Sequence, residues 1–244
     1  MTVFLLVLAG VAGGLCGSVA GLASIVTYPA LLAAGLAPLQ ANVTNTVALV
    51  FTSIGSVSAS RTELAGQRAK ITPLAVIAVA GGAVGGLVLL LAPADSFEVV
   101  VPVLVGLASL AVLAPRPHSH VHGDRPEPRW LRPAVFANGV YSGYFGAASG
   151  VMLLATLLAG WVESFPRVNA AKSLIAGLGN AMGAVVFVVA GHVDWQLGIP
   201  LAIGLFVGGR LGPWVVRHSS PTILRYVIAA AGVGLAVKLG IDAY

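Results

Sequence analysis

The chain has 244 residues, of which 58% are hydrophobic and 9% are charged, with a net charge of +5 and a mean hydropathy of +0.97. A soluble domain of this length cannot hide so much apolar surface in one core, so the composition excludes an ordinary soluble enzyme or binding protein. The excess of cations would suit nucleic acid in a soluble protein. Here the cations lie at the ends of apolar segments, where they set membrane orientation instead.

Six apolar stretches have the length of a single membrane crossing. An α-helix needs about 20 residues to cross roughly 30 Å of hydrocarbon, and its backbone polar groups must be satisfied within the helix. The sequence therefore predicts an all-α integral membrane protein. The expected single spans are 42–60, 71–92, 96–114, 169–190, 196–216 and 221–241.

Two further apolar stretches, 2–36 and 133–162, do not fit a single crossing. One helix through all of 2–36 would reach about 52 Å, well beyond the bilayer. Glycines interrupt both stretches near the middle: Gly13, Gly14, Gly17 and Gly21 in the first, and Gly139, Gly143, Gly146 and Gly150 in the second. We expect helical hairpins or broken helices that enter and leave on the same side. The alternative is that these glycines only permit close helix packing.

The two halves of the chain repeat at a spacing of 127 residues. Pro73 recurs as Pro200, and the pair Gly81-Gly82 recurs as Gly208-Gly209. A duplication of several helices at a fixed period is typical of transporters. We therefore expect a first repeat over 1–114, a linker over 115–130 and a second repeat over 131–244, each repeat with one hairpin and three spans.

The charges predict that the second repeat is inverted. The loop after 42–60 carries Arg61, Arg68 and Lys70, whereas the equivalent loop of the second half carries Asp194 and no cation. With inverted repeats, eleven of the thirteen Lys and Arg residues fall in the cytoplasm and only Lys238 falls outside. This topology puts the linker in the cytoplasm and both termini outside the inner membrane. Eight plain spans are the alternative.

Polar residues, with Ser56 and Ser60 among them, follow one face of span 42–60, and others follow one face of its counterpart, 169–190. Their helical spacing points them in one direction. Amides and hydroxyls donate hydrogen bonds without fixed charge, so a cavity between the two faces would suit a small oxyanion. The same residue types also hold membrane helices together, which is the alternative. The candidates are Asn42, Asn45, Thr46 and Ser53 in the first half, and Asn169, Lys172, Ser173 and Asn180 in the second.

Lys172 is the one candidate with a fixed charge, and it lies inside an apolar span. A charge at the centre of a bilayer costs at least about 2.5 kcal/mol. A protein keeps such a charge where a function needs it, or lowers the cost because the long side chain extends to the membrane surface. Two interpretations stay open: contact with a bound anion, or a side chain that extends to the cytoplasmic interface. All eight carboxylates lie in loops or at helix ends, which argues against a cation as substrate.

The glycine-rich stretches supply a second set of candidates. Unwound backbone at membrane depth exposes helix ends, whose free N–H groups bind anions. The residues placed to contribute are Ser24, Thr27, Tyr28, Ser149 and Gly150.

The sequence contains no arrangement typical of catalysis. It has no Gly-x-Ser-x-Gly elbow, no paired carboxylates and no phosphate loop, so we expect neither an enzyme nor a cofactor. His118, His120 and His122 alternate in the linker, but without a partner cysteine they make a weak metal site, and we expect no bound metal. Cys16 is the single cysteine, so an intrachain disulfide is excluded.

The duplicated pattern of a glycine-rich segment, a proline and a polar helix resembles the sulfite exporter TauE/SafE family. Family members show Gly-x-x-Gly-x-Gly-Gly-Gly and a following proline in each half. The matching positions are Gly17, Ala20, Gly21, Ser24 and Pro29, then Gly143, Gly146, Ser149 and Gly150. The glycine triplet is reduced in both halves, and Ala155 replaces the second proline.

This resemblance implies export of sulfite, sulfoacetate or related organosulfonates from the cytoplasm. Together with the residues, it predicts a secondary transporter that moves a small anion by alternating access between inverted halves. The expected partners are this anion and the lipid bilayer, and a homo-oligomer is compatible with the sequence. Transport of another small anion or a neutral metabolite remains an alternative, as do a membrane-embedded enzyme and an assembly factor.

Overall fold

The computed structural model describes residues 2–92 and 127–218, and in these two ranges the only regular secondary structure is helix. The first half contains α1 (Thr2–Ala20), α2 (Ala23–Ala33), α3 (Pro38–Ala59), α4 (Arg61–Leu64) and α5 (Arg68–Leu91). The second half contains α7 (Leu131–Tyr144), α8 (Ser149–Gly160), α9 (Phe165–Ala190) and α10 (Trp195–His218). The predicted spans 96–114 and 221–241 and the three linker histidines lie outside the described residues.

Each long glycine-rich stretch is divided into two helices. The first breaks between α1 and α2, where Gly21 has a φ of +82°, a conformation that costs a residue with a side chain about 1–2 kcal/mol. The second breaks between α7 and α8, where Gly146 has a φ of +73° and Ala148 a φ of 56°. Glycine thus ends the leading helix of each pair, and the chain turns back on itself.

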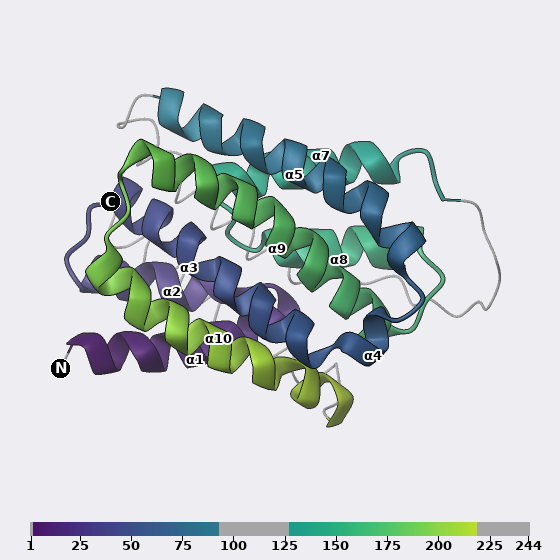
Figure 1. Ribbon diagram of the computed structural model, residues 1–244, viewed down its shortest axis with the longest axis horizontal. Helices are drawn as coiled ribbons and strands as arrows, with labels where there is room; N and C mark the ends of the chain where they lie inside the picture. Colours follow the sequence, from purple (N-terminus) through teal and green to yellow (C-terminus); the bar gives the residue numbers. More distant parts are fainter. Residues whose placement is uncertain (1, 93–126, 219–244) are drawn as a thin grey trace, which may run out of the picture.

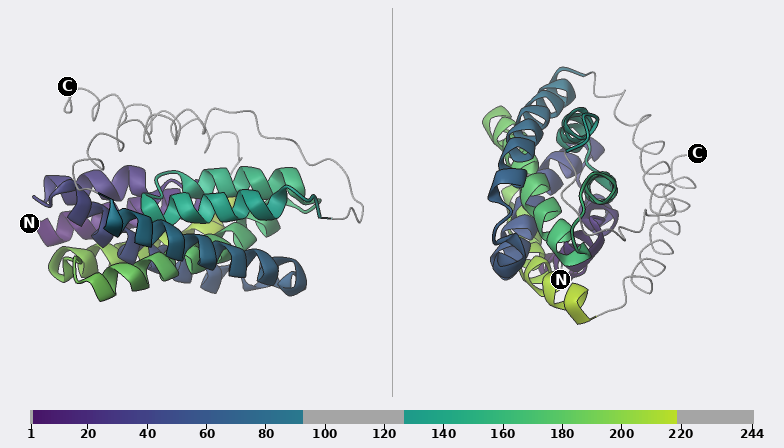
Figure 2. Two further views of the ribbon diagram at one scale, coloured as in Figure 1. Left: turned by 90° about the horizontal axis from the view of Figure 1, so that it is seen from above. Right: turned by 90° about the vertical axis from the view of Figure 1, so that its right-hand side faces the viewer.

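The two helix pairs enter the bundle from opposite ends (Figure 1). The α1–α2 pair opens toward the end where the N-terminus lies, and the α7–α8 pair opens toward the end where α4 lies. The left view of Figure 2, in which the long axis is also horizontal, shows the same arrangement. Their tips meet inside the bundle, where a Cβ on Gly150 would lie 2.6 Å from the Cα of Gly21. We call this contact the tip junction.

Equivalent helices of the two halves pack in equivalent ways. The principal neighbour of α1 is α10, and that of α7 is α5, while α3 and α9 face each other between them. Gly82 of α5 lies against the carbonyl of Gly179, and Gly209 of α10 lies against the carbonyl of Thr52. These two contacts are related by the 127-residue spacing. In both, the missing side chain lets two membrane helices approach backbone to backbone.

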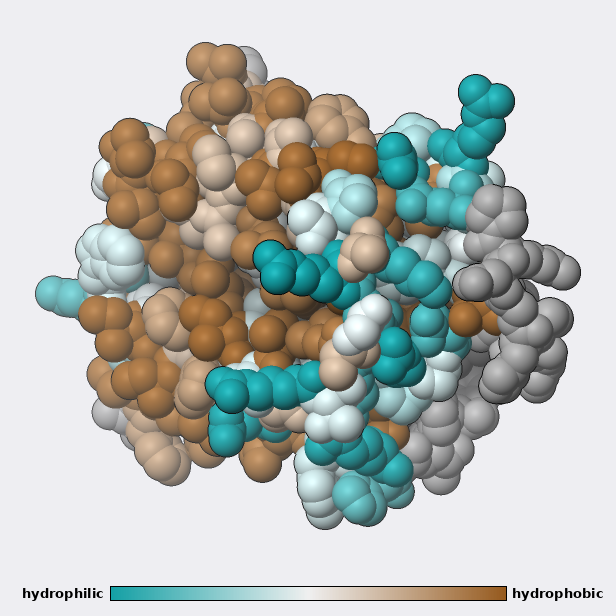
Figure 3. Space-filling model, turned by 45° about the vertical axis from the view of Figure 1, so that its right-hand side comes forward, coloured by the Kyte–Doolittle hydropathy of each residue, from teal (hydrophilic) through white to brown (hydrophobic). Residues whose placement is uncertain are grey.

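The outer surface is that of a membrane protein. Among the described residues, α1, α5, α9 and α10 are each long and apolar enough to cross a bilayer. Large apolar side chains are exposed along them, including Leu91 and Val189, and hydrophilic residues gather toward one end (Figure 3). The chain is therefore a multi-pass membrane protein.

Helix α3 has the length of a span, with 22 residues or about 33 Å, but it is more polar than those four helices. Its polar residues face inward: Asn42, Asn45, Thr46 and Ser56 are all less than 3% exposed. The polarity that lowers its hydropathy therefore belongs to the interior of the bundle and not to its lipid-facing surface.

Candidate functional site

A small polar cavity of about 50 Å³ lies where the tip junction meets α3 and α9. A volume of this size holds only a few water molecules. The structure brings seven of the thirteen candidate residues to its wall: Ser24, Ser53, Ser149, Gly150, Lys172, Ser173 and Asn180. Ser56 of the predicted polar face also lines the wall. The wall further includes residues that the sequence analysis did not select as site residues: Gly17, Ser18, Gly21, Ala23, Leu49, Thr52, Gly146 and Ala176.

Two helix N-termini face this cavity. Ala23 and Ser24 begin α2, Ser149 and Gly150 begin α8, and all four line the cavity wall. The first N–H groups of a helix have no intrahelical acceptor, and the helix dipole adds partial positive charge there. No carboxylate is among the described residues that line the cavity, so these helix ends face it without a compensating negative charge.

Lys172 adds a full positive charge to the cavity. Its side chain is 2% exposed, so the alternative that it extends to the cytoplasmic interface is wrong. Its Nζ donates hydrogen bonds to the carbonyl oxygens of Gly17 and Ser18, both at 3.1 Å. These carbonyls belong to the last turn of α1, where the helix dipole is negative and favours a cation. The ammonium group therefore joins α9 of the second half to the tip of the first hairpin.

Asn42 and Asn169 make equivalent contacts across the two halves. The amide nitrogen of Asn169 donates to the carbonyl of Ser18 at the end of α1, at 3.0 Å. The amide nitrogen of Asn42 donates to the carbonyl of Tyr144 at the end of α7, also at 3.0 Å. Neither residue lines the cavity. Both donate to carbonyls at the end of a hairpin's leading helix, where no intrahelical N–H is available, so their contacts position the hairpin tips.

The other four candidates support the first hairpin from behind the cavity wall. Asn45 accepts a hydrogen bond from Thr27 and donates to Ser24 Oγ at 3.2 Å. Thr46 donates to its own helix, at the carbonyl of Asn42. Tyr28 packs edge-on against Phe145, with 5.7 Å between the ring centroids. These contacts hold α2 against α3 and against the break between α7 and α8.

Hydroxyl groups form a chain across the cavity wall. Ser18 donates to Ser56 at 3.0 Å, and Ser56 donates to Ser173 at 3.1 Å, which links α1, α3 and α9. In the second hairpin, Ser142 donates to Asn180. Hydroxyls of this kind exchange partners by rotation, so they can turn toward a bound oxyanion without moving the backbone.

Thr52 shows what the sequence analysis missed. Its hydroxyl oxygen is buried, lines the cavity and has no hydrogen-bond partner among the described residues. Thr52 lies on the same helical face as Asn45 and as Ser56, which belongs to the predicted polar face, so periodicity alone could have selected Thr52 as well. Ser18 lies in the glycine-rich run of α1, where no pattern distinguishes it from a packing residue.

A second polar arrangement lies at the α4 end of the bundle and joins the two halves. Glu63 pairs with Arg217 at 2.7 Å, and Glu163 pairs with Lys70 at 3.1 Å and with Arg167 at 2.8 Å. We call these five residues the charged cluster. The hydrogen bond from Arg217 holds the pKa of the Glu63 carboxyl below its ordinary value. At the opposite end, the Asp194 N–H donates to the Thr44 hydroxyl.

Comparison with known proteins identifies the family of this chain. A family model described as "Sulfite exporter TauE/SafE" matches residues 6–239, nearly the whole chain. The chain belongs to the sulfite exporter TauE/SafE family. It is similar to a probable membrane transporter protein, ORF9, of Sinorhizobium sp, at 30% identity over 98% of this chain and 92% of the relative.

Other relatives of this TauE/SafE chain carry the same kind of description. The probable membrane transporter YfcA of Escherichia coli K12 is 26% identical, over 95% of this chain and 87% of the relative. A probable membrane transporter protein of Haemophilus influenzae is 25% identical, over 92% of this chain and 89% of the relative. No solved structure matches the chain. The chain is accordingly a membrane transporter of this family.

Proposed function

We propose that this TauE/SafE transporter exports a small sulfur oxyanion or organosulfonate from the cytoplasm, by alternating access of the central cavity. The observation that carries the proposal is the composition of the cavity wall. A buried ammonium, two helix N-termini and several hydroxyls converge there, and none of the described residues on the wall is a carboxylate. Such a set stabilises an anion and repels a cation.

The arrangement of the halves supports alternating access between inverted repeats. The hairpins open to opposite ends and meet at the cavity, so a rocking motion of one half against the other would expose the cavity to either side in turn. Polar contacts between the halves, such as Asn42 to Tyr144 and Lys172 to Gly17, are the contacts that this motion would break and remake.

We place the α4 end in the cytoplasm of a cell with an inner membrane, and the N-terminus outside. Arg61, Arg68, Lys70, Arg167 and Arg217 lie in α4, at the start of α5 or α9, or at the end of α10. Cations accumulate in short cytoplasmic connections, which favours this orientation. In the same orientation, the charged cluster closes the cytoplasmic entrance.

Loss of the Glu63–Arg217 pair should open this entrance. We expect Glu63→Gln to speed labelling of a cysteine at position 56, in a Cys16→Ala background, by about twofold to fivefold, since a partly exposed ion pair contributes up to about 1 kcal/mol. The measurement is the rate of reaction with an impermeant thiol reagent. Arg132→Gln is the matched control, because it breaks the Arg132–Glu127 pair within the second half.

The Glu63–Arg217 pair also predicts in which direction the closure of the entrance changes with pH. Because the folded-state pKa of Glu63 is lowered, its pairing supports closure above the ordinary carboxyl pKa and is lost as the pH falls through the lowered value. The cysteine itself reacts more slowly at acid pH in both proteins, because only the thiolate reacts. The labelling rate of the Glu63 protein divided by that of Glu63→Gln at the same pH should therefore rise toward acid pH. A ratio that does not change with pH would contradict closure by this pair.

The substrate class is tested by titrating purified protein with sulfite, sulfoacetate, taurine, sulfate and thiosulfate. We expect saturable calorimetric binding of sulfite or sulfoacetate. Taurine, which carries an additional cation, should bind more weakly at a positive cavity. Binding of a different anion would support the anion site and contradict the proposed substrate. Binding of neutral metabolites with no response to any anion would overturn the proposal.

A further inference from the structure

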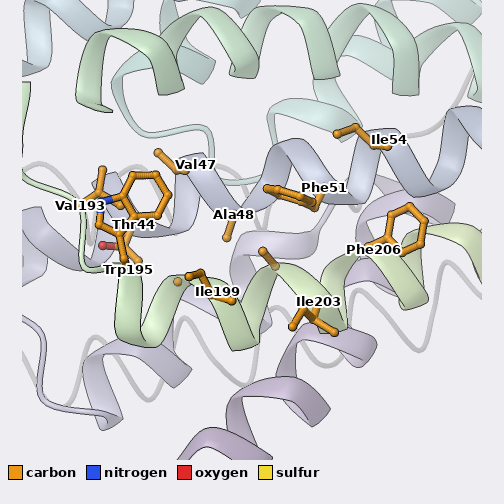
Figure 4. Close-up of a pocket in the computed structure, with 12 residues that line it drawn as sticks. Thr44, Val47, Ala48, Phe51, Ile54, Val193, Trp195, Ile199, Ile203 and Phe206 are labelled. Carbon is orange, nitrogen blue, oxygen red and sulfur yellow. The ribbon is translucent and has the colours of Figure 1, made fainter. Parts of the chain in front are cut away.

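A long apolar groove lies on the surface between α3 and α10, away from the polar cavity (Figure 4). Its volume is about 390 Å³. Val47, Phe51 and Ile54 of α3 line it together with Ile199, Ile203 and Phe206 of α10, and Trp195 lies at one end. Thr44 contributes the one hydroxyl of the lining, and this hydroxyl already accepts the Asp194 N–H.

The groove exists because small and large residues alternate on the two helices. Ala48, Gly198 and Ala202 line it with little or no side chain, and Ala48 and Ala202 are buried. Phe51, Ile199 and Ile203 stand 42–55% exposed beside them. The space between these walls runs along the helices, and among the described residues that line it only Thr44 and Trp195 have side chains that form hydrogen bonds.

The position of the groove corresponds to one leaflet of the bilayer. Helix α10 runs from Trp195 to Arg217 over about 33 Å, close to the hydrocarbon thickness, and tryptophan and arginine both favour the interfaces. Phe206 lies eleven residues after Trp195, or about 16 Å along the helix axis. The groove therefore begins at the Trp195 interface and ends near the bilayer midplane.

We propose that this groove is a binding site for one acyl chain of a phospholipid from the leaflet on the Trp195 side. A fatty-acyl chain has the required shape, since it is narrow, apolar and aligned with the helices over one leaflet. A second copy of this chain would need a convex apolar ridge to fill the same space. The site is separate from the transport cavity, so the proposal goes beyond the proposed function.

The test uses the whole protein in detergent, titrated with a phospholipid that carries bromine atoms on its acyl chains. Bromine quenches tryptophan fluorescence on contact, and Trp195 is 51% exposed at the groove. The contribution of Trp195 is the difference between the parent and Trp195→Phe. We expect this contribution to fall along a saturable curve as the lipid is added.

Filling the groove should remove this site and leave the protein folded. We expect Ala202→Leu to weaken lipid binding by about tenfold or more, because each methylene displaced from the groove loses its transfer free energy. Ile199→Ala, which widens the groove, should keep saturable quenching. Ala80→Phe is the control, since Ala80 is exposed on α5, outside the groove.

Three results would overturn the proposal. Quenching that rises without saturation indicates ordinary bulk lipid around Trp195. Equal binding to the parent and to folded Ala202→Leu places the lipid elsewhere. A dimer that dissociates in Ala202→Leu, with quenching unchanged by lipid, assigns the groove to a second copy of the chain.

Discussion

Replacing Lys172 with alanine should reduce the affinity for the transported anion by about tenfold to a hundredfold, the loss of one charge-assisted hydrogen bond of roughly 1.5–3 kcal/mol. Lys172 is the only cation among the described residues on the cavity wall, and its ammonium group lies at the junction of both halves. Lys172→Arg should keep part of the affinity, because the charge survives while its shape and hydration differ. The measurement is calorimetric titration with sulfite.

A structural role of Lys172 must be separated from a role in binding. Its ammonium also satisfies the carbonyls of Gly17 and Ser18, so its loss weakens the end of α1. Asn169→Ala removes another donor from the same Ser18 carbonyl without changing the charge of the cavity. It should lower the melting temperature and leave the anion affinity within about twofold. Equal affinity loss in Asn169→Ala and Lys172→Ala would assign Lys172 to folding alone.

The helical class and the position of the glycine breaks could be predicted because both follow from short-range rules. Apolar length predicts membrane helices, and a glycine cluster within an overlong stretch predicts a break. Gly21 and Gly146 fall within the predicted clusters. The boundaries of α3 differ from the predicted span because Pro38 starts the helix four residues earlier, where the fixed φ of proline suits a first turn.

The composition of the cavity was harder to predict because it depends on contacts between distant segments. The polar residues on one face of α3 and of α9 were predicted to point inward together. The sequence could not tell which of them reach the cavity. Asn42 and Asn169 instead bond to helix ends more than a hundred residues away. Ser18 enters the wall only because the first hairpin folds back at Gly21.

The charged cluster was missed for a different reason. Its cations were interpreted as orientation signals, which act through their number on each side of the membrane. Lys70 can pair with Glu163, and Glu63 with Arg217, only where the fold brings the two halves next to each other. A single sequence does not show which side chains of the two halves lie next to each other.

Substituting Gly21 with alanine should prevent stable folding, because two penalties coincide at this position. The backbone φ of +82° costs about 1–2 kcal/mol for a residue with a Cβ. The new Cβ would also overlap the backbone of Gly150 across the tip junction, and backbone atoms cannot move aside as a flexible side chain can. Overpacking of this kind adds about 1–3 kcal/mol or more, so we expect a total of about 2–5 kcal/mol or more.

Two further alanine variants separate the contributions. Gly191→Ala shares the positive φ, at 77°, but has no atom within 4 Å of its new Cβ, so it should lose only about 1–2 kcal/mol. Gly150→Ala crowds the same junction from the other side without a positive φ and should lose about 1–3 kcal/mol. Thermal unfolding of the detergent-solubilised proteins ranks all three. If Gly21→Ala had the same melting temperature as Gly191→Ala, the hairpin tips would not be in contact. The cavity that they enclose would then have to be placed elsewhere.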